Sequence, residues 1–217
     1  MKLIDINQFK THFKDNLTIM VGGFMAVGTS EKLIDALVET NVKNLTIICN
    51  DAGFPDKGIG KLISNNQVRR LLASHVGLNP NVAKMMSERS LEVELIPQGT
   101  LVEQIRAGGA GLGGILTPTG IGTIVEERKQ KITVDGREYL LEKPLKADIA
   151  ILRGTKVDKY GNVIYNATTR NFNPIMAMAA EKVFVFAENF VDSLDPNNIM
   201  TPHIFIDYII KENHDEY

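Results

Sequence analysis

Short apolar runs alternate with amphipathic stretches through the first half of the chain, at the spacing of strands and helices in an α/β protein. The runs have the length and character of strands buried on both faces. They fall at 17–21 (LTIMV) and 45–49 (LTIIC), and two more short strands are predicted over 68–73 and 91–96. Since about 25 residues separate the first two, the chain is expected to form βαβ units. This pattern predicts an α/β fold, an open and mostly parallel sheet flanked by helices.

Amphipathic stretches that are predicted to form helices separate these runs. Leu33, Ile34 and Leu37 fall on one face of a helix that either Thr29 or Ser30 can cap. A further helix is expected near 82–88.

A later helix is predicted to begin at Thr100. Thr100 and Glu103 have the spacing of a capping box, and Gly108 is a natural stop for the helix.

Beyond residue 123 the pattern changes to hairpins. Asp135-Gly136 lies between alternating segments over 131–141, which is a strong hairpin signal, and 157–165 resembles a second hairpin. A strand is expected over 147–153 and a helix from Pro174 to Glu181. The second half is therefore predicted to be rich in β-hairpins, within a single domain over 1–217.

Composition narrows the function classes. The chain has 217 residues, is 44% apolar and carries a formal net charge of −2, with no basic run. This balance argues against nucleic acid or an anionic membrane as a partner. A single cysteine, Cys49, suits a reducing compartment and is expected to be a buried filler. No run approaches the length of a membrane span, so a cytoplasmic protein is expected.

A glycine loop joins the first strand to its helix. It consists of Gly22, Gly23, Phe24, Met25, Ala26, Val27 and Gly28. A glycine loop between a strand and a helix N-terminus can receive a phosphate. It can also be only a tight turn, and spacing alone does not separate these interpretations.

A second glycine cluster follows the helix that begins near Thr100. It includes Gly108, Gly109, Gly111, Gly113 and Gly114. Gly109-x-Gly111-x-x-Gly114 matches the dinucleotide fingerprint in letters, but that fingerprint requires a strand before it and a helix after it. Here a helix precedes it and Pro118 and Gly120 follow, so dinucleotide binding is disfavoured.

Two amide side chains follow predicted strands. Asn50 comes directly after 45–49, and Gln98 follows the strand over 91–96. Since parallel strands end at one edge of a sheet, these amides and both glycine loops are expected to converge there. The histidines are far apart, so no metal site is expected, and no nucleophile elbow occurs. These parts suit an anion or an oxyanion in a site for a phosphate-bearing small molecule.

The chain resembles the alpha subunit of family I (3-oxoacid) coenzyme A-transferases, which act on acetate, acetoacetate and butyrate. The stretches that carry the resemblance extend over nearly the whole chain. They are Asp15-Asn16 through Gly22-Gly23-Phe24 to Gly28, Asn50-Asp51-Ala52-Gly53, Pro97-Gln98-Gly99-Thr100, Arg106 to Gly111 and on to Thr117-Pro118-Thr119-Gly120, and Arg170-Asn171-Phe172-Asn173-Pro174.

The resemblance implies a site shared with a beta subunit, commonly in an α2β2 assembly. The nucleophile is expected to be a glutamate of the beta chain, which forms a glutamyl-CoA thioester. In this chain Glu188-Asn189 is followed by Phe190 rather than by the family's glycine, so no catalytic nucleophile is expected here. Coenzyme A is expected as a thioester substrate, with no permanently bound cofactor.

The resemblance also assigns roles to the site residues. Residues 22–28 correspond to the family's CoA-binding loop, Asn50 and Gln98 to donors that steady the thioester oxyanion or the substrate carboxylate, and 108–114 to a loop lining the same site. Two positions differ from the family: Ser30 replaces a proline, and Asp51 stands where some members have a second asparagine. Charge repulsion by Asp51 is expected to alter the preference for the substrate acid.

Two other functions remain as alternatives. A sugar-phosphate isomerase or deaminase would use Lys57 and Lys61 as a phosphate clamp together with an acid–base pair. A non-catalytic module that binds coenzyme A or another phosphate ligand would need no partner.

Overall fold

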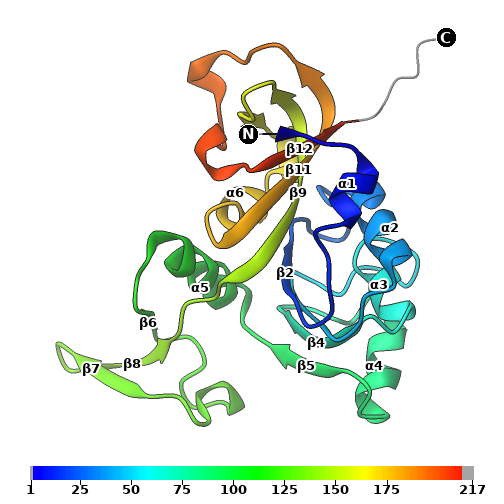
Figure 1. Cartoon of the computed structure of the whole chain (residues 1–217). Helices are drawn as coiled ribbons and strands as arrows, with labels where there is room; N and C mark the ends of the chain where they lie inside the picture. The colour runs from blue at the N-terminus through cyan, green and yellow to red at the C-terminus, as the bar shows by residue number, and fades with distance from the viewer. Residues whose placement is uncertain (1, 212–217) are drawn as a thin grey trace.

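The structure, a computed structural model, describes residues 2–211 and is built on a central sheet. The sheet has nine strands in the order β1-β12-β11-β9-β2-β3-β4-β5, with β10 paired to β9 (Figure 1). Their bounds are β1 Lys2–Leu3, β2 Thr18–Val21, β3 Leu45–Ile48, β4 Val68–Ala73, β5 Glu92–Leu95, β9 Ala147–Asp158, β10 Val163–Ile164, β11 Ala180–Val191 and β12 Tyr208–Lys211. Every pairing in this sheet is parallel except that of β10 with β9. The predicted mostly parallel α/β fold is confirmed.

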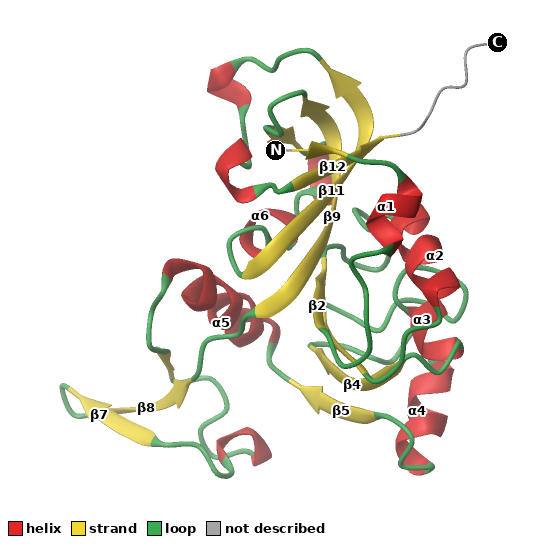
Figure 2. Cartoon of the chain, viewed as in Figure 1, coloured by secondary structure: helices red, strands yellow, loops and turns green. Residues whose placement is uncertain are grey.

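Helices cover both faces of the sheet (Figure 2). Their bounds are α1 Ile6–Lys10, α2 Glu31–Thr40, α3 Gly60–Ser64, α4 Pro80–Ser87, α5 Gln98–Ala110 and α6 Asn173–Met176. On one face Ile19 and Val21 of β2 pack in a core with residues of α1–α4, and on the other Met20 packs with residues of α5 and α6. The runs of β2 and β3 are almost entirely apolar because these central strands bury both faces, whereas the edge strand β5 is largely exposed.

The helix after the first glycine loop begins as predicted. Ser30 is its N-cap, and its Oγ accepts a hydrogen bond of 3.3 Å from the Leu33 N–H. Thr29 has a different role, since its hydroxyl donates to the Gly22 carbonyl at 2.9 Å. Ser30 thus stabilises the first turn of α2 by capping it, whereas a proline would stabilise that turn through its fixed φ.

The predicted bounds of α5 are wrong. The helix begins at Gln98, after Pro97, and ends at Ala110, with Gly111 as a C-cap whose φ is 70°. No capping box forms at Thr100, which lies inside the helix, and Glu103 pairs with Arg106. Gly108 does not stop the helix because it is needed for packing, where a Cβ atom would collide with the Leu145 carbonyl.

A three-stranded antiparallel sheet projects from the body as an arm (Figure 1). Its strands are β6 Ile115–Thr117, β7 Lys131–Val134 and β8 Arg137–Glu142, with a short 3-10 helix, η1, at Ile124–Glu126. The predicted hairpin is confirmed, and Asp135 and Gly136 both have positive φ, as a two-residue hairpin turn requires. Among residues 111–143 only Leu140 and Glu142 are buried. The arm therefore has almost no core of its own.

The remaining C-terminal predictions are confirmed in part. The hairpin over 157–165 exists, with β10 turning back on the end of β9. The helix expected from Pro174 to Glu181 is much shorter, because α6 ends at Met176 and β11 begins at Ala180. The remaining 3-10 helices are η2 Ala167–Thr169, η3 Pro196–Asn198 and η4 His203–Phe205.

Candidate functional site

The glycine loop over 22–28 lies at the point where the strand order reverses. From β2 the chain continues to β3, β4 and β5 on one side, and β9, β11 and β12 fill the other side. Ligands of open α/β sheets bind outside the carboxyl ends of the strands at such a switch point. The loop leaves β2 there, with the Gly22 N–H bound to the Ile151 carbonyl of β9 at 3.0 Å.

The loop is a tight turn with apolar side chains at its tip. Phe24 and Val27 exchange two backbone hydrogen bonds of 3.0 and 2.9 Å, and Met25 and Ala26 between them have φ of 49° and 64°. Left-handed backbone costs about 1–2 kcal/mol at a non-glycine residue, so the surrounding structure must hold the turn in place. Phe24, Met25 and Val27 are 42%, 41% and 46% exposed, and they form a free apolar rim beside the loop's backbone.

Three side chains hold this turn. An Asp51 carboxylate oxygen accepts from the Met25 N–H at 2.7 Å. The amide nitrogen of Asn171 donates to the Val27 carbonyl at 2.9 Å, and that of Asn173 donates to the Gly28 carbonyl at 3.1 Å. The turn is therefore fixed from two directions, by the segment after β3 and by the start of α6 with the residues just before it.

The structure brings Asn50 and Gln98 into direct contact. Gln98 Nε2 donates to Asn50 Oδ1 at 2.7 Å, although the residues are 48 positions apart. Asn50 is only 2% exposed and its own amide nitrogen donates to Asp51 at 2.8 Å, whereas Gln98 is exposed. Of the two amides, Gln98 is the one that can reach a ligand, and the buried Asn50 holds it in place by accepting its hydrogen bond.

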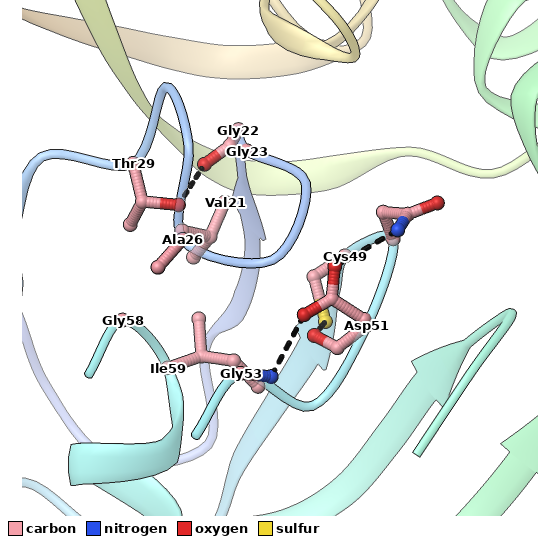
Figure 3. Close-up of a pocket in the computed structure, with 11 residues that line it drawn as sticks. Val21, Gly22, Gly23, Ala26, Thr29, Cys49, Asp51, Gly53, Gly58 and Ile59 are labelled. Carbon is pink, nitrogen blue, oxygen red and sulfur yellow. Dashed lines mark hydrogen bonds between the residues drawn. The ribbon is translucent and has the colours of Figure 1, made fainter. Parts of the chain in front are cut away.

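A small pocket lies between the glycine loop and the segment after β3 (Figure 3). Gly22, Gly23, Ala26 and Thr29 line one side, and Cys49, Asp51 and Gly53 line the other. Burial, and then the nearby Asp51 carboxylate, raise the pKa of the Cys49 thiol well above its usual range. Cys49 is 3% exposed and stays a neutral thiol, as expected of a buried filler.

The second glycine cluster does not join this site within the chain, contrary to the expectation that all these parts converge. Gly108 and Gly109 belong to α5, and Gly109 packs against Met178. Gln98 begins the same helix, so Gly108 lies about 15 Å along its axis from Gln98. Gly111, Gly113 and Gly114 come later still and lead into the arm. The helix separates these residues because it runs back along the sheet from the edge where Gln98 stands.

Of the two lysines that the isomerase alternative would use, Lys57 is exposed and Lys61 is engaged elsewhere. Lys61 binds Glu31 and Asp35 at 2.7 and 2.6 Å. Its pKa is raised, because these carboxylates outweigh the effect of burial, which lowers it. Glu188 pairs with Arg153 at 3.0 Å.

Within residues 2–211 no cluster of three or more His, Cys, Asp or Glu side chains is placed to hold a metal ion, and none of the described helices is long and apolar enough to cross a membrane.

Comparison with known proteins identifies the family. The model of the coenzyme A transferase family matches residues 6–212. The chain belongs to the coenzyme A transferase family. The match confirms the resemblance found in the sequence and does not support the isomerase or the stand-alone module.

Close relatives of this coenzyme A transferase chain are alpha subunits. The acetoacetyl-CoA:acetate/butyrate CoA transferase alpha subunit of Clostridium acetobutylicum is 57% identical over 213 residues, covering 97% of this chain and 98% of that protein. The acetate CoA-transferase subunit alpha of Escherichia coli is 50% identical over 211 residues, covering 96% of each chain.

Solved structures show the same fold. An acyl-CoA transferase of E. coli O157:H7, solved as a thioester complex with CoA, has a TM-score of 0.87 at 22% identity. The match covers 99% of this coenzyme A transferase chain but 48% of that one, so the chain spans about half the length of that structure. Glutaconate coenzyme A-transferase of Acidaminococcus fermentans has a TM-score of 0.86 at 16% identity, with 97% and 75% covered.

Two residues that organise the site were missed as such in the sequence. The sequence marks Asp51 as a departure from the family pattern that affects acid preference, and Asn173 only as part of a matching stretch. An acidic residue next to Asn50 at the end of a strand is a signal for an internal acceptor, since a carboxylate there can bind loop N–H groups. For Asn173 the sequence holds no comparable signal, because the Arg153 N–H and the Gly28 carbonyl that it binds are 20 and 145 positions away.

Proposed function

We propose that the chain is the alpha subunit of a coenzyme A-transferase that moves CoA between acetoacetyl-CoA and a short-chain acid such as acetate or butyrate. The observation that carries this is the contact of Gln98 with Asn50, which holds an exposed neutral donor at the carboxyl edge of the sheet, beside the switch-point loop. The names of the relatives supply the substrate class.

Gln98 is the residue proposed to act on the reacting thioester. Attack of a carboxylate on the thioester carbonyl places negative charge on its oxygen, and a fixed N–H group stabilises that charge. Gln98 Nε2 carries two hydrogens, of which one binds Asn50 and the other is free to face this oxygen.

The attacking carboxylate is proposed to be a glutamate of the beta subunit. Its attack expels CoA thiolate and leaves an acyl-glutamyl anhydride. The thiolate then attacks the glutamyl carbonyl, the first acid leaves as its carboxylate, and a glutamyl-CoA thioester remains. An acceptor carboxylate repeats these steps in reverse. The alpha chain contributes the donor and the binding surface, and the assembly is proposed to be α2β2 in the cytoplasm, with 1–217 acting as one domain.

Residues 22–28 are proposed to contact coenzyme A, which arrives as substrate and not as a resident cofactor. The loop presents an apolar rim of Phe24, Met25 and Val27 at its tip, which suits the pantetheine chain. The second glycine cluster is proposed to line the site of the assembled enzyme from the other end of α5. Gly108 and Gly109 belong to that helix, and Gly111, Gly113 and Gly114 lead from it into the arm.

Acetoacetyl-CoA:acetate transfer tests this proposal with the chain alone and with its beta chain. Activity is expected only for the pair. In the pair, Gln98→Ala is expected to lower kcat by about 10²–10³-fold, the effect of losing one oxyanion donor. Gln130→Ala, an exposed glutamine beyond the site, is the matched control and is expected to keep full activity. A lone chain that turns over, or a fully active Gln98→Ala enzyme, would refute the proposal.

A further inference from the structure

Asp51 is a buried acidic side chain surrounded by hydrogen-bond donors. It is 6% exposed, and within residues 2–211 no lysine or arginine forms an ion pair with it. Its oxygens accept from the Met25 N–H at 2.7 Å, from Asn50 Nδ2 at 2.8 Å and from the Gly53 N–H at 2.9 Å. Burial of a carboxylate without a cation is costly, and these charge-assisted hydrogen bonds are what offsets that cost.

The charge of Asp51 determines which way Asn50 faces. An ionised carboxylate accepts hydrogen bonds and donates none, so the Asn50 atom beside it must be the amide nitrogen. Asn50 Oδ1 then faces the opposite way, where it accepts from Gln98 Nε2 at 2.7 Å and from the Ser74 hydroxyl at 3.2 Å.

The orientation of Asn50 in turn determines that of Gln98. Because Asn50 presents an oxygen, Gln98 must present its nitrogen, and Gln98 Oε1 is turned away. An asparagine at position 51 has both a donor and an acceptor, so both amides could rotate together and keep their mutual hydrogen bond. After that rotation Gln98 would place an oxygen where it now places an N–H group, and that oxygen would repel an oxyanion.

We propose that Asp51 is a positioning residue that acts through Asn50 to hold the Gln98 amide with its N–H group toward the reacting oxygen. The same carboxylate holds the Met25 N–H and therefore places the glycine loop relative to Gln98. This proposal rests on the proposed function, because it assigns to Asp51 the orientation of the donor named there.

A double-mutant cycle in the complete enzyme with its beta chain tests the proposal. Asp51→Asn is expected to lower kcat at least about tenfold, within the roughly 10²-fold that misplacement of a catalytic group can cost. In a Gln98→Ala background the same change is expected to lower kcat less than about twofold, because residues that act as one unit are not additive. Asp56→Asn, an exposed aspartate in the following turn, is the matched control and is expected to have no effect.

The outcomes separate the two proposals. Equal losses from Asp51→Asn with and without Gln98 would overturn the positioning role and leave the role of Gln98 intact. A fully active Gln98→Ala enzyme would instead refute the proposed function. If Asp51→Asn does not fold, Asn50→Ala breaks the same link and must show the same non-additivity.

A spectroscopic measurement on the full chain needs no activity at all. The side-chain amide signal of Gln98, assigned by its loss in Gln98→Ala, is expected to shift in Asp51→Asn and to stay in place in Asp56→Asn. An unchanged signal in Asp51→Asn would overturn the positioning role even if the enzyme shows no transfer activity.

Discussion

The side chain of Asn173 occupies the space that a Cβ atom on Gly22 would need. Asn173 is fully buried and connects segments that are far apart in the chain. Its amide nitrogen donates to the Gly28 and Thr169 carbonyls at 3.1 and 2.9 Å, and its oxygen accepts from the Arg153 N–H at 3.2 Å. Gly22 is therefore a glycine because an asparagine fills its place, which explains one glycine of the loop without reference to a ligand.

Replacing Asn173 by alanine is expected to destabilise the protein and loosen the loop. The change leaves two carbonyls and one N–H group without their partner, and each such buried group costs about 1–3 kcal/mol unless water reaches it. Urea unfolding is the measurement. Asn197→Ala, which removes only a contact with the neighbouring Asp195, is the control and is expected to change stability by less than about 0.5 kcal/mol. Similar losses in both variants would contradict the bracing role.

Two glycines of α5 are expected to respond to alanine in opposite directions. At Gly108 a Cβ atom would collide with the Leu145 carbonyl, so Gly108→Ala must displace backbone and is expected to lower the melting temperature. At Gly99 nothing lies within 4 Å, so Gly99→Ala is expected to raise stability by up to about 1 kcal/mol through helix propensity. Thermal unfolding of both variants checks the pair, and a tolerant Gly108→Ala would show that the packing there is loose.

The arm is expected to depend on a polar contact at its base. Glu142 binds Lys129 at 2.6 Å and accepts from Gln104 Nε2 of α5 at 3.2 Å. Because the Glu142 side chain is 4% exposed and that of Lys129 26% exposed, Lys129→Met leaves a buried carboxylate without its cation. Hydrogen exchange over 131–142 is expected to accelerate in this variant. Lys143→Met changes an exposed neighbouring residue and should leave the exchange rate over 131–142 unchanged. Equal exchange rates in the two variants would show that the contact of Lys129 with Glu142 does not hold the arm.

Asp158 is expected to make stability depend on pH in acid. Burial by itself raises the pKa of Asp158, but hydrogen bonds from the Asn162 side chain and from three backbone N–H groups, of Asn162, Leu194 and Tyr160, outweigh it and lower the pKa. A depressed folded-state pKa means that the stabilisation is complete above the unfolded value of about 4 and is lost as pH falls through the folded value.

The stability difference between wild type and Asp158→Asn should therefore be largest near neutral pH and narrow below about pH 4. Denaturant unfolding between those limits measures it, with the exposed Asp192→Asn as control. If the difference in stability between wild type and Asp158→Asn does not depend on pH, the charge of Asp158 is not what stabilises the turn between β9 and β10.

Strands were predictable here because their signal is local. The run at 45–49 is almost entirely apolar because β3 is largely buried on both faces, and the run at 68–73 ends in three buried apolar residues after Arg69 and Arg70; the bounds of both strands agree within a residue. The Asp135-Gly136 hairpin was equally predictable, because these two residue types readily adopt the positive φ that the turn needs and that both have in the structure. Propensity and burial point the same way at these positions.

The start and end of α5 were misjudged because tertiary contacts outweigh capping signals. Gly108 looked like a stop, but the Leu145 carbonyl requires a residue without a side chain inside the helix. The rule that parallel strands end at one edge of a sheet predicts that Asn50 and Gln98 lie at the same edge, and the structure places them there in direct contact. The sequence does not predict the orientation of the two amides, because that orientation follows from hydrogen bonds that only the folded chain forms.

Helix α5 begins at Gln98 and extends 13 residues toward the arm. A helix of that length is a stiff rod of about 20 Å. Leu101 and Ile105 pack in the core, and Gly108 lies against the Leu145 carbonyl near the end of the helix that leads to the arm. Gln98 and the arm are therefore held at a fixed separation by one rigid element, although neither contacts the other.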